Sequence, residues 1–120
     1  MAPLNGDGSA APLKPTELHI LLALSAGDSH GYALRQEILR QTEGQLELEA
    51  GNLYRHIRRL EDEGLLEESS RRPPPSRDDE RRRYYRLTPL GRRTLTAELR
   101  RMRSIVRLAE ARRLIAPEAS

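Results

Sequence analysis

Residues 50–63, AGNLYRHIRRLEDE, carry the pattern from which the rest of the fold can be worked out. The apolar residues Leu53, Ile57 and Leu60 recur at i, i+4 and i+7, so on an α-helix they form one stripe. Gly64 follows at a position where glycine commonly ends a helix. The spacing predicts an amphipathic helix over this segment that buries the stripe.

The opposite face of this helix is polar and basic. At about 100° per residue, the face away from the stripe holds Gly51, Asn52, Arg55, Arg58 and Arg59, with Tyr54 on one flank. Arginine pairs with guanine edges and asparagine with adenine edges in the DNA major groove, so we expect Asn52, Arg55 and Arg59 to read bases and Arg58 to hold phosphate. The acidic residues 61–63 would repel phosphate, which favours insertion of the N-terminal half. Taken alone, such a helix would be interpreted as a solvated surface of mixed charge, and it is the basic segment after it that favours DNA.

Two helices are expected before this segment. Pro15 begins the first, because proline suits the first turn of a helix, and residues 26–28 end it. The second begins near Gly31, with Ser29 as its candidate cap, and closes at residues 42–44.

Two strands are expected after it, at residues 65–69 and 83–87, where Tyr85 and Leu87 share one face by alternation. Three consecutive prolines between the strands predict a loop. Three helices and a hairpin make a winged helix-turn-helix, a fold that is mainly α with a small antiparallel β-hairpin. In this fold the third helix enters the major groove and the hairpin, or wing, reaches the DNA backbone or minor groove.

The expected wing is strongly basic. Residues 71–86 contain seven arginines and three acidic residues. Arginines of this kind suit phosphates or a narrow minor groove, although proline and charge would also keep a merely soluble loop extended. The candidate contacts are Arg71, Arg72, Arg81, Arg82 and Arg83.

A long last helix is predicted from a Thr88 cap and Pro89 to about Arg113. Leu95, Leu99, Met102, Val106 and Ala109 are spaced 4, 3, 4 and 3 residues apart and form a heptad seam, with Ile105 and Leu108 beside it. The candidate dimer-interface residues are Leu95, Leu99, Met102, Ile105, Val106 and Ala109. Only the first turns could fold back on their own domain, so we expect a two-fold dimer that presents two third helices to a palindromic site.

Composition narrows the function classes. The chain has 120 residues, 32% of them charged, and its net charge of +3 divides into −3 over residues 1–48 and +6 over residues 49–120. It has no Cys, which excludes thiolate chemistry and permits a reducing compartment. No apolar run approaches the ~20 residues of a membrane span. The histidines His19, His30 and His56 show no metal or catalytic spacing, so we expect no metal, no cofactor and no enzyme.

Four segments, taken together, resemble the PadR family of bacterial transcriptional regulators over residues 13–114. They are LKPTELHILLAL at 13–24, HGYALRQEI at 30–38, GNLYRHIRRLEDEGLLE at 51–67 and RRRYYRLTPLGRRTL at 81–95. The resemblance implies a dimeric winged-helix repressor of the short subfamily, with one C-terminal dimerisation helix. It places Gly51, Asn52, Tyr54 and Arg55 at the start of the recognition helix and implies a structural role for residues 30–32.

The chain departs from the family pattern in two places. Glu49–Ala50 stands where many relatives have Ser-Pro, and no Trp or Phe is present to stack on a flat aromatic ligand. We expect a tail at 1–12, the DNA-binding domain at 13–87, the dimerisation helix at 88–114 and a tail at 115–120.

The sequence thus favours a homodimeric, sequence-specific repressor acting on a palindromic operator in the bacterial cytoplasm, at the nucleoid. Its partners would be double-stranded DNA and a second copy, with release by a small-molecule effector that the sequence does not identify. The alternative is a winged-helix module that binds protein without DNA.

Overall fold

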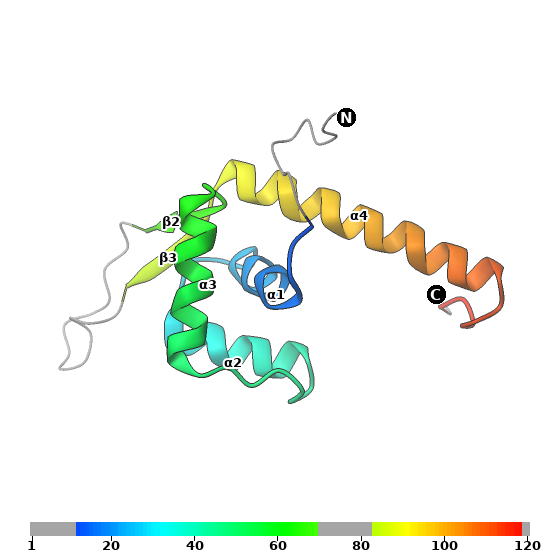
Figure 1. Ribbon diagram of the computed structural model, residues 1–120, viewed down its shortest axis with the longest axis horizontal. Helices are drawn as coiled ribbons and strands as arrows, with labels where there is room; N and C mark the ends of the chain where they lie inside the picture. Colours follow the sequence, from blue (N-terminus) through cyan, green and yellow to red (C-terminus); the bar gives the residue numbers. More distant parts are fainter. Residues whose placement is uncertain (1–11, 70–82, 119–120) are drawn as a thin grey trace.

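The computed structural model describes residues 12–69 and 83–118 (Figure 1). Helices dominate this part of the chain, and a small sheet lies beside the third of them. The elements are α1 (Pro15–Leu24), β1 (Ser29–His30), α2 (Gly31–Gln41), α3 (Ala50–Asp62), β2 (Leu66–Glu68), β3 (Tyr84–Leu87) and α4 (Pro89–Ala111). No helix in the described ranges is long and apolar enough to cross a membrane.

The core lies where α1, α2 and α3 meet the sheet. The expected stripe of α3 is buried, and each neighbouring helix contributes leucine or isoleucine to the same cluster. The largest fully buried side chains are Ile20, Leu21, Leu34, Ile38, Leu53, Ile57, Leu60 and Leu66. Aliphatic packing of this kind fixes which side of α3 is left for solvent.

The sheet confirms the expected hairpin and adds a third strand to it. Its order is β1-β3-β2, and both pairings are antiparallel. Tyr85 of β3 lies opposite Ser29 on one side and Glu68 on the other. The architecture is therefore mainly α with a small antiparallel sheet.

The start of α2 corrects one expectation. Ser29 does not cap this helix, because it is drawn into β1 opposite Tyr85. His30 is the cap instead, and its Nδ1 accepts a hydrogen bond from the Ala33 N–H at 3.3 Å. The His30 ring also meets the Tyr84 ring edge to face, with centroids 5.2 Å apart.

A compact joint connects the end of α3 to the start of α4. Thr88 caps α4 as expected: its Oγ1 accepts from the Gly91 N–H at 2.9 Å and donates to the Gly64 carbonyl at 2.6 Å. A Cβ at Gly91 would lie only 1.9 Å from the Leu65 carbonyl oxygen. Only glycine lets the first turn of α4 approach this closely, so the joint holds the two helices at a defined angle.

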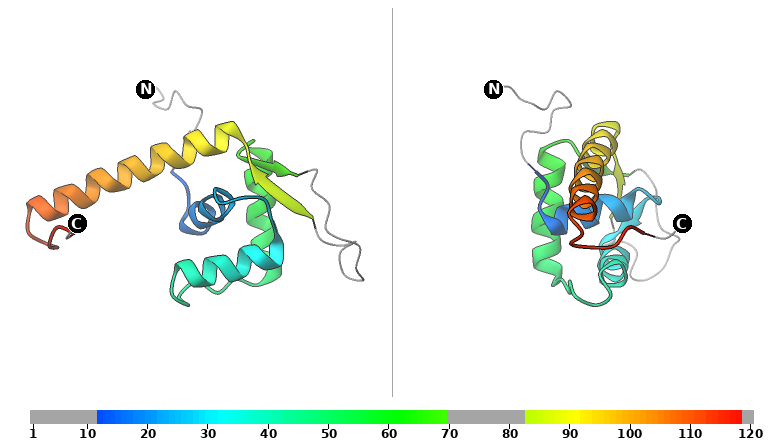
Figure 2. Two further views of the ribbon diagram at one scale, coloured as in Figure 1. Left: turned by 180° about the vertical axis from the view of Figure 1, so that it is seen from behind. Right: turned by 90° about the vertical axis from the view of Figure 1, so that its right-hand side faces the viewer.

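The far half of α4 extends away from the other helices (Figures 1 and 2). The helix has 23 residues, or ~35 Å at 1.5 Å per residue, and it ends at Ala111, two residues before the expected Arg113. Leu95, expected in the dimer seam, is only 4% exposed and belongs to the core of its own chain. The heptad pattern continues across the point where the helix leaves the body, so the spacing alone could not separate core from seam.

Candidate nucleic-acid interface

The solvent side of α3 carries the residues that the sequence places there. Asn52, Arg55 and Arg58 are exposed, and a Cβ at Gly51 would meet nothing within 4 Å. The Arg35 side chain of α2 donates from Nε to the carbonyl of Leu48, which lies two residues before α3, at 2.8 Å. The N-terminal end of α3 is thereby fixed to α2 while its outer face stays open.

Asn52 and Arg55 act as one polar unit on that face. The Asn52 Oδ1 accepts a hydrogen bond from the Arg55 guanidinium one turn further along α3. Both side chains are exposed, so an incoming base edge could compete for either. The pair combines the side chains suited to adenine and to guanine.

Two arginines from different elements line a hollow between α3 and the sheet. Arg58 comes from α3 and Arg83 lies next to β3, and the hollow measures about 360 Å³. The other lining residues are Tyr54, Ile57, Glu61 and Tyr85. Burial raises the pKa of the Tyr85 phenol, which keeps that side chain uncharged. Two guanidinium groups around an aromatic wall suit a phosphate, although Glu61 opposes it from the C-terminal side.

Tyr54 explains a glycine that sequence reasoning assigned only a general structural role. A Cβ at Gly31 would lie 2.3 Å from the Tyr54 Oη. The start of α2 therefore approaches the flank of α3 as closely as a glycine allows. No local pattern signals this contact, because the two residues lie in different helices.

Arg59 occupies a different environment from the other polar residues of α3. Its side chain is 48% exposed, and its Nε lies 3.8 Å from the Glu17 Oε2 of α1 and 3.4 Å from the Glu63 Oε2 of its own helix. The sequence predicts that Arg59 reads bases from the outer face, whereas in the structure its guanidinium points toward two carboxylates.

Most of the expected wing contacts lie outside the described residues. Arg71, Arg72, Arg81 and Arg82 belong to this group. Arg83 is described, and its Nε is 3.7 Å from the Glu68 Oε2 of β2. Arg86, on the other face of β3, pairs with Glu67 at 2.8 Å.

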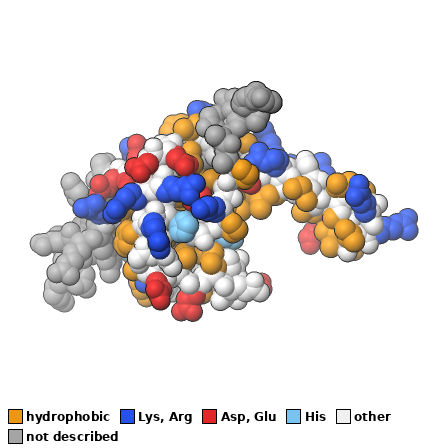
Figure 3. Space-filling model, in the orientation of Figure 1, with side chains coloured by type: hydrophobic (Ala, Val, Ile, Leu, Met, Phe, Trp, Pro, Cys, Tyr) orange, Lys and Arg blue, Asp and Glu red, His pale blue; other side chains and the backbone are white. Residues whose placement is uncertain are grey.

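Basic side chains gather over the middle of α3, and acidic ones mark its ends (Figure 3). The acidic residues beyond its C-terminal turn were expected from the sequence. Exposed Glu47 and Glu49 also flank its N-terminus, where Glu49 is the cap residue but makes no side-chain cap hydrogen bond. The basic surface is therefore bounded along the helix and continues sideways toward the sheet.

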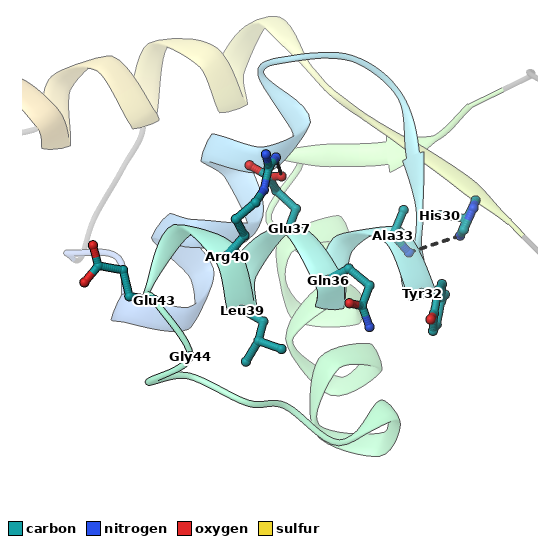
Figure 4. Close-up of a pocket in the computed structure, with 9 residues that line it drawn as sticks. All are labelled: His30, Tyr32, Ala33, Gln36, Glu37, Leu39, Arg40, Glu43 and Gly44. Carbon is teal, nitrogen blue, oxygen red and sulfur yellow. Dashed lines mark hydrogen bonds and ion pairs between the residues drawn. The ribbon is translucent and has the colours of Figure 1, made fainter.

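A second hollow lies on the outer side of α2 (Figure 4). Its side chains diverge: Glu37 and Arg40 pair on one side, while Gln36 and Leu39 point to the other. Small-molecule sites need polar groups that converge on one point. The described ranges also hold no cluster of three or more residues suited to a metal ion.

Along α4 the expected seam beyond Leu95 is exposed, apart from Ala109, which is half-buried. The exposed apolar residues are Leu99, Met102, Ile105, Val106 and Leu108. Leu114 and Ile115, beyond the helix, are also exposed and were not singled out from the sequence.

Three helices, an antiparallel sheet beside the third and an outer face of asparagine and arginine define a winged helix-turn-helix protein. The family model "Transcriptional regulator PadR-like family" matches residues 20–97. The chain belongs to this family of transcriptional regulators.

Solved structures of transcriptional regulators share this fold. A transcriptional regulator from Clostridium thermocellum superposes with a TM-score of 0.65 at 25% identity, covering 80% of this chain and 87% of that one. A PadR family transcription regulator from Clostridium difficile R20291 gives a TM-score of 0.68 at 22% identity, covering 82% and 97%. Bacillus subtilis PadR in complex with operator DNA gives a TM-score of 0.60 at 20% identity, covering 73% of this chain and 48% of that one. A search of curated proteins found no significant match.

Proposed function

We propose that this chain is a homodimeric, sequence-specific DNA-binding repressor. The observation that carries the proposal is the outer face of α3, where Asn52, Arg55 and Arg58 are exposed while the opposite stripe is buried. A structural neighbour, Bacillus subtilis PadR, was solved in complex with operator DNA, which supports the same use of the fold here.

The roles of the side chains follow from their surroundings. Arg55 and Asn52 read base edges, because they are exposed on α3 and already oriented toward each other. Arg58 and Arg83 hold the phosphate backbone from the hollow between α3 and the sheet. Arginines of the wing beyond the described residues add further phosphate or minor-groove contacts.

The dimer is proposed from α4. An amphipathic helix this long does not leave its apolar seam in water when a second copy can cover it. A two-fold pair of such helices presents two copies of α3, and the operator is then palindromic. Such a repressor acts in the cytoplasm at the nucleoid, and a small-molecule effector would release it from DNA.

Selection of bound duplexes from a random pool tests the proposal. The full chain is mixed with the pool at low salt, and the retained duplexes are sequenced. We expect a palindromic half-site repeated at a fixed spacing. Binding to no duplex in dilute buffer would refute DNA binding and leave the protein-binding module. Enrichment of a single unrepeated half-site would refute the two-fold arrangement.

A further inference from the structure

Glu17 is a charged residue where the packing is otherwise aliphatic. It lies in the first turn of α1, and its side chain is only 5% exposed. A buried carboxylate is costly unless charged or hydrogen-bonding groups compensate it. The identity of those groups therefore indicates what the residue does.

The two carboxylate oxygens of Glu17 have separate partners. Oε1 accepts a hydrogen bond from the Lys14 N–H at 3.2 Å, which closes the N-terminus of α1. Oε2 faces α3, with the His56 Nδ1 at 3.4 Å and the Arg59 Nε at 3.8 Å. Oε1 thus hydrogen-bonds within α1, and Oε2 contacts the recognition helix α3 at two residues on one flank.

The contact with Glu17 differs from the other ion pair of Arg59. Glu63 is 49% exposed, so its pairing with Arg59 is screened by water and salt. Glu17 is buried, and its attraction for the guanidinium is screened much less. Glu63 is the nearer partner and accepts a hydrogen bond from the Arg59 Nε, but Glu17 is the partner whose attraction for Arg59 persists as salt is added.

We infer that Glu17 is a positioning residue of the DNA-binding surface. It holds Arg59 against α1, so that α3 presents Asn52, Arg55 and Arg58 and withholds a further cation from DNA. Glu17 thereby sets how much of the affinity of α3 is independent of base sequence. The inference rests on the proposed function, because it concerns the same surface.

The test is the salt dependence of binding of the full chain to one mixed-sequence duplex, measured by fluorescence anisotropy. Each phosphate contact contributes about −0.9 to the slope of log affinity against log salt. Glu17→Gln keeps the size of the side chain and removes its charge. We expect it to steepen the slope by about one contact, ~0.9, and to tighten binding at low salt.

Matched variants separate release of Arg59 from a general change in charge. The double variant Glu17→Gln/Arg59→Gln should have the same salt slope as Arg59→Gln alone. Glu63→Gln, which removes the exposed partner, should change the slope less than Glu17→Gln does. If Glu17→Gln still steepens the salt slope when Arg59 is absent, the effect comes from the change in net charge and not from release of Arg59. That result would overturn the inference.

A second pair of variants keeps the test valid if Glu17→Gln does not fold, as judged by circular dichroism. Arg58→Gln should flatten the slope by about 0.9, whereas Arg59→Gln should flatten it less. Equal losses would overturn the inference. A wild-type chain that binds no duplex would refute the proposed function. A wild-type chain that binds, with Glu17→Gln identical to it, would refute only the role of Glu17.

Discussion

The helices α3 and α4 are both amphipathic and rich in arginine, yet the apolar face of α3 is buried and most of that of α4 is exposed. α3 buries its stripe of Leu53, Ile57 and Leu60 completely inside its own domain. α4 buries Leu95 and then leaves the body, with Ile105 65% exposed further along. The apolar residues of α3 pack against the core of their own chain, whereas those in the far half of α4 do not.

The difference shows which face of each helix is available for function. Because the apolar side of α3 is occupied, only its polar side can meet a partner, and DNA fits that chemistry. The exposed part of α4 carries an apolar seam beside its arginines, and a second copy of α4 is proposed to cover that seam. The joint at Thr88 and Gly91 connects the two helices and so relates one proposed interface to the other.

The largest expected effect comes from placing a charge in the seam of α4. Val106→Asp puts a carboxylate where the two copies are proposed to meet, so the dimer should dissociate. Loss of two-site binding should weaken affinity for the selected palindromic duplex by about 10²- to 10⁴-fold. Light scattering after size exclusion and anisotropy measure the two effects.

Leu108→Asp is the matched control for that variant. Leu108, expected beside the seam, is about as exposed as Val106, but it lies two residues, or about 200°, further round the helix than Val106 and so on the side away from it. Leu108→Asp should leave both the molar mass of the dimer and its affinity for the selected duplex unchanged. A monomeric wild type, or equal effects of the two variants, would contradict the proposed use of α4.

The joint should be sensitive to a single methyl group. Gly91→Ala directs a Cβ at the Leu65 carbonyl oxygen, and the required shift should lower the free energy of unfolding by about 1–3 kcal/mol. Gly51→Ala is the control: open space surrounds the new Cβ, so the free energy of unfolding should rise by up to about 1 kcal/mol. Urea titration measures both. Similar values for the two would show that α4 does not depend on close approach.

Features set by local periodicity could be predicted from the sequence. The stripe of α3 and the hairpin strand at Tyr85 depend on neighbours a few residues away, and both are confirmed. The Thr88 cap is likewise a local signal, and its hydrogen bond to Gly91 is present.

Features that depend on distant partners could not be predicted. β1 has two residues and exists only because β3 pairs with it. Its formation took Ser29 away from the capping position and left His30 to fill it. The contact of Glu17 with Arg59 joins residues far apart in the sequence, and neither residue type signals the other.

On the α3 side of the comparison, Arg55→Ala should affect specificity. The loss of a base contact should cost about 1–3 kcal/mol of binding free energy on the selected duplex and relax the preference at one position of each half-site. Repeating the selection with the variant measures the preference directly. An unchanged affinity together with an unchanged half-site would mean that the outer face of α3 does not face the bases.

The smallest expected effect concerns the edge of the same surface. Arg83 and Arg86 both have exposed side chains near β3, but they lie on opposite faces of the strand, since side chains alternate. Arg83 lines the hollow beside Arg58, and Arg86 pairs with Glu67 away from it. Arg83→Gln should therefore flatten the salt slope by about 0.9 on every duplex alike, whereas Arg86→Gln should leave it unchanged. If Arg86→Gln has the larger effect, the DNA backbone passes along the other face of the sheet, and the hollow between α3 and β3 is not the phosphate site.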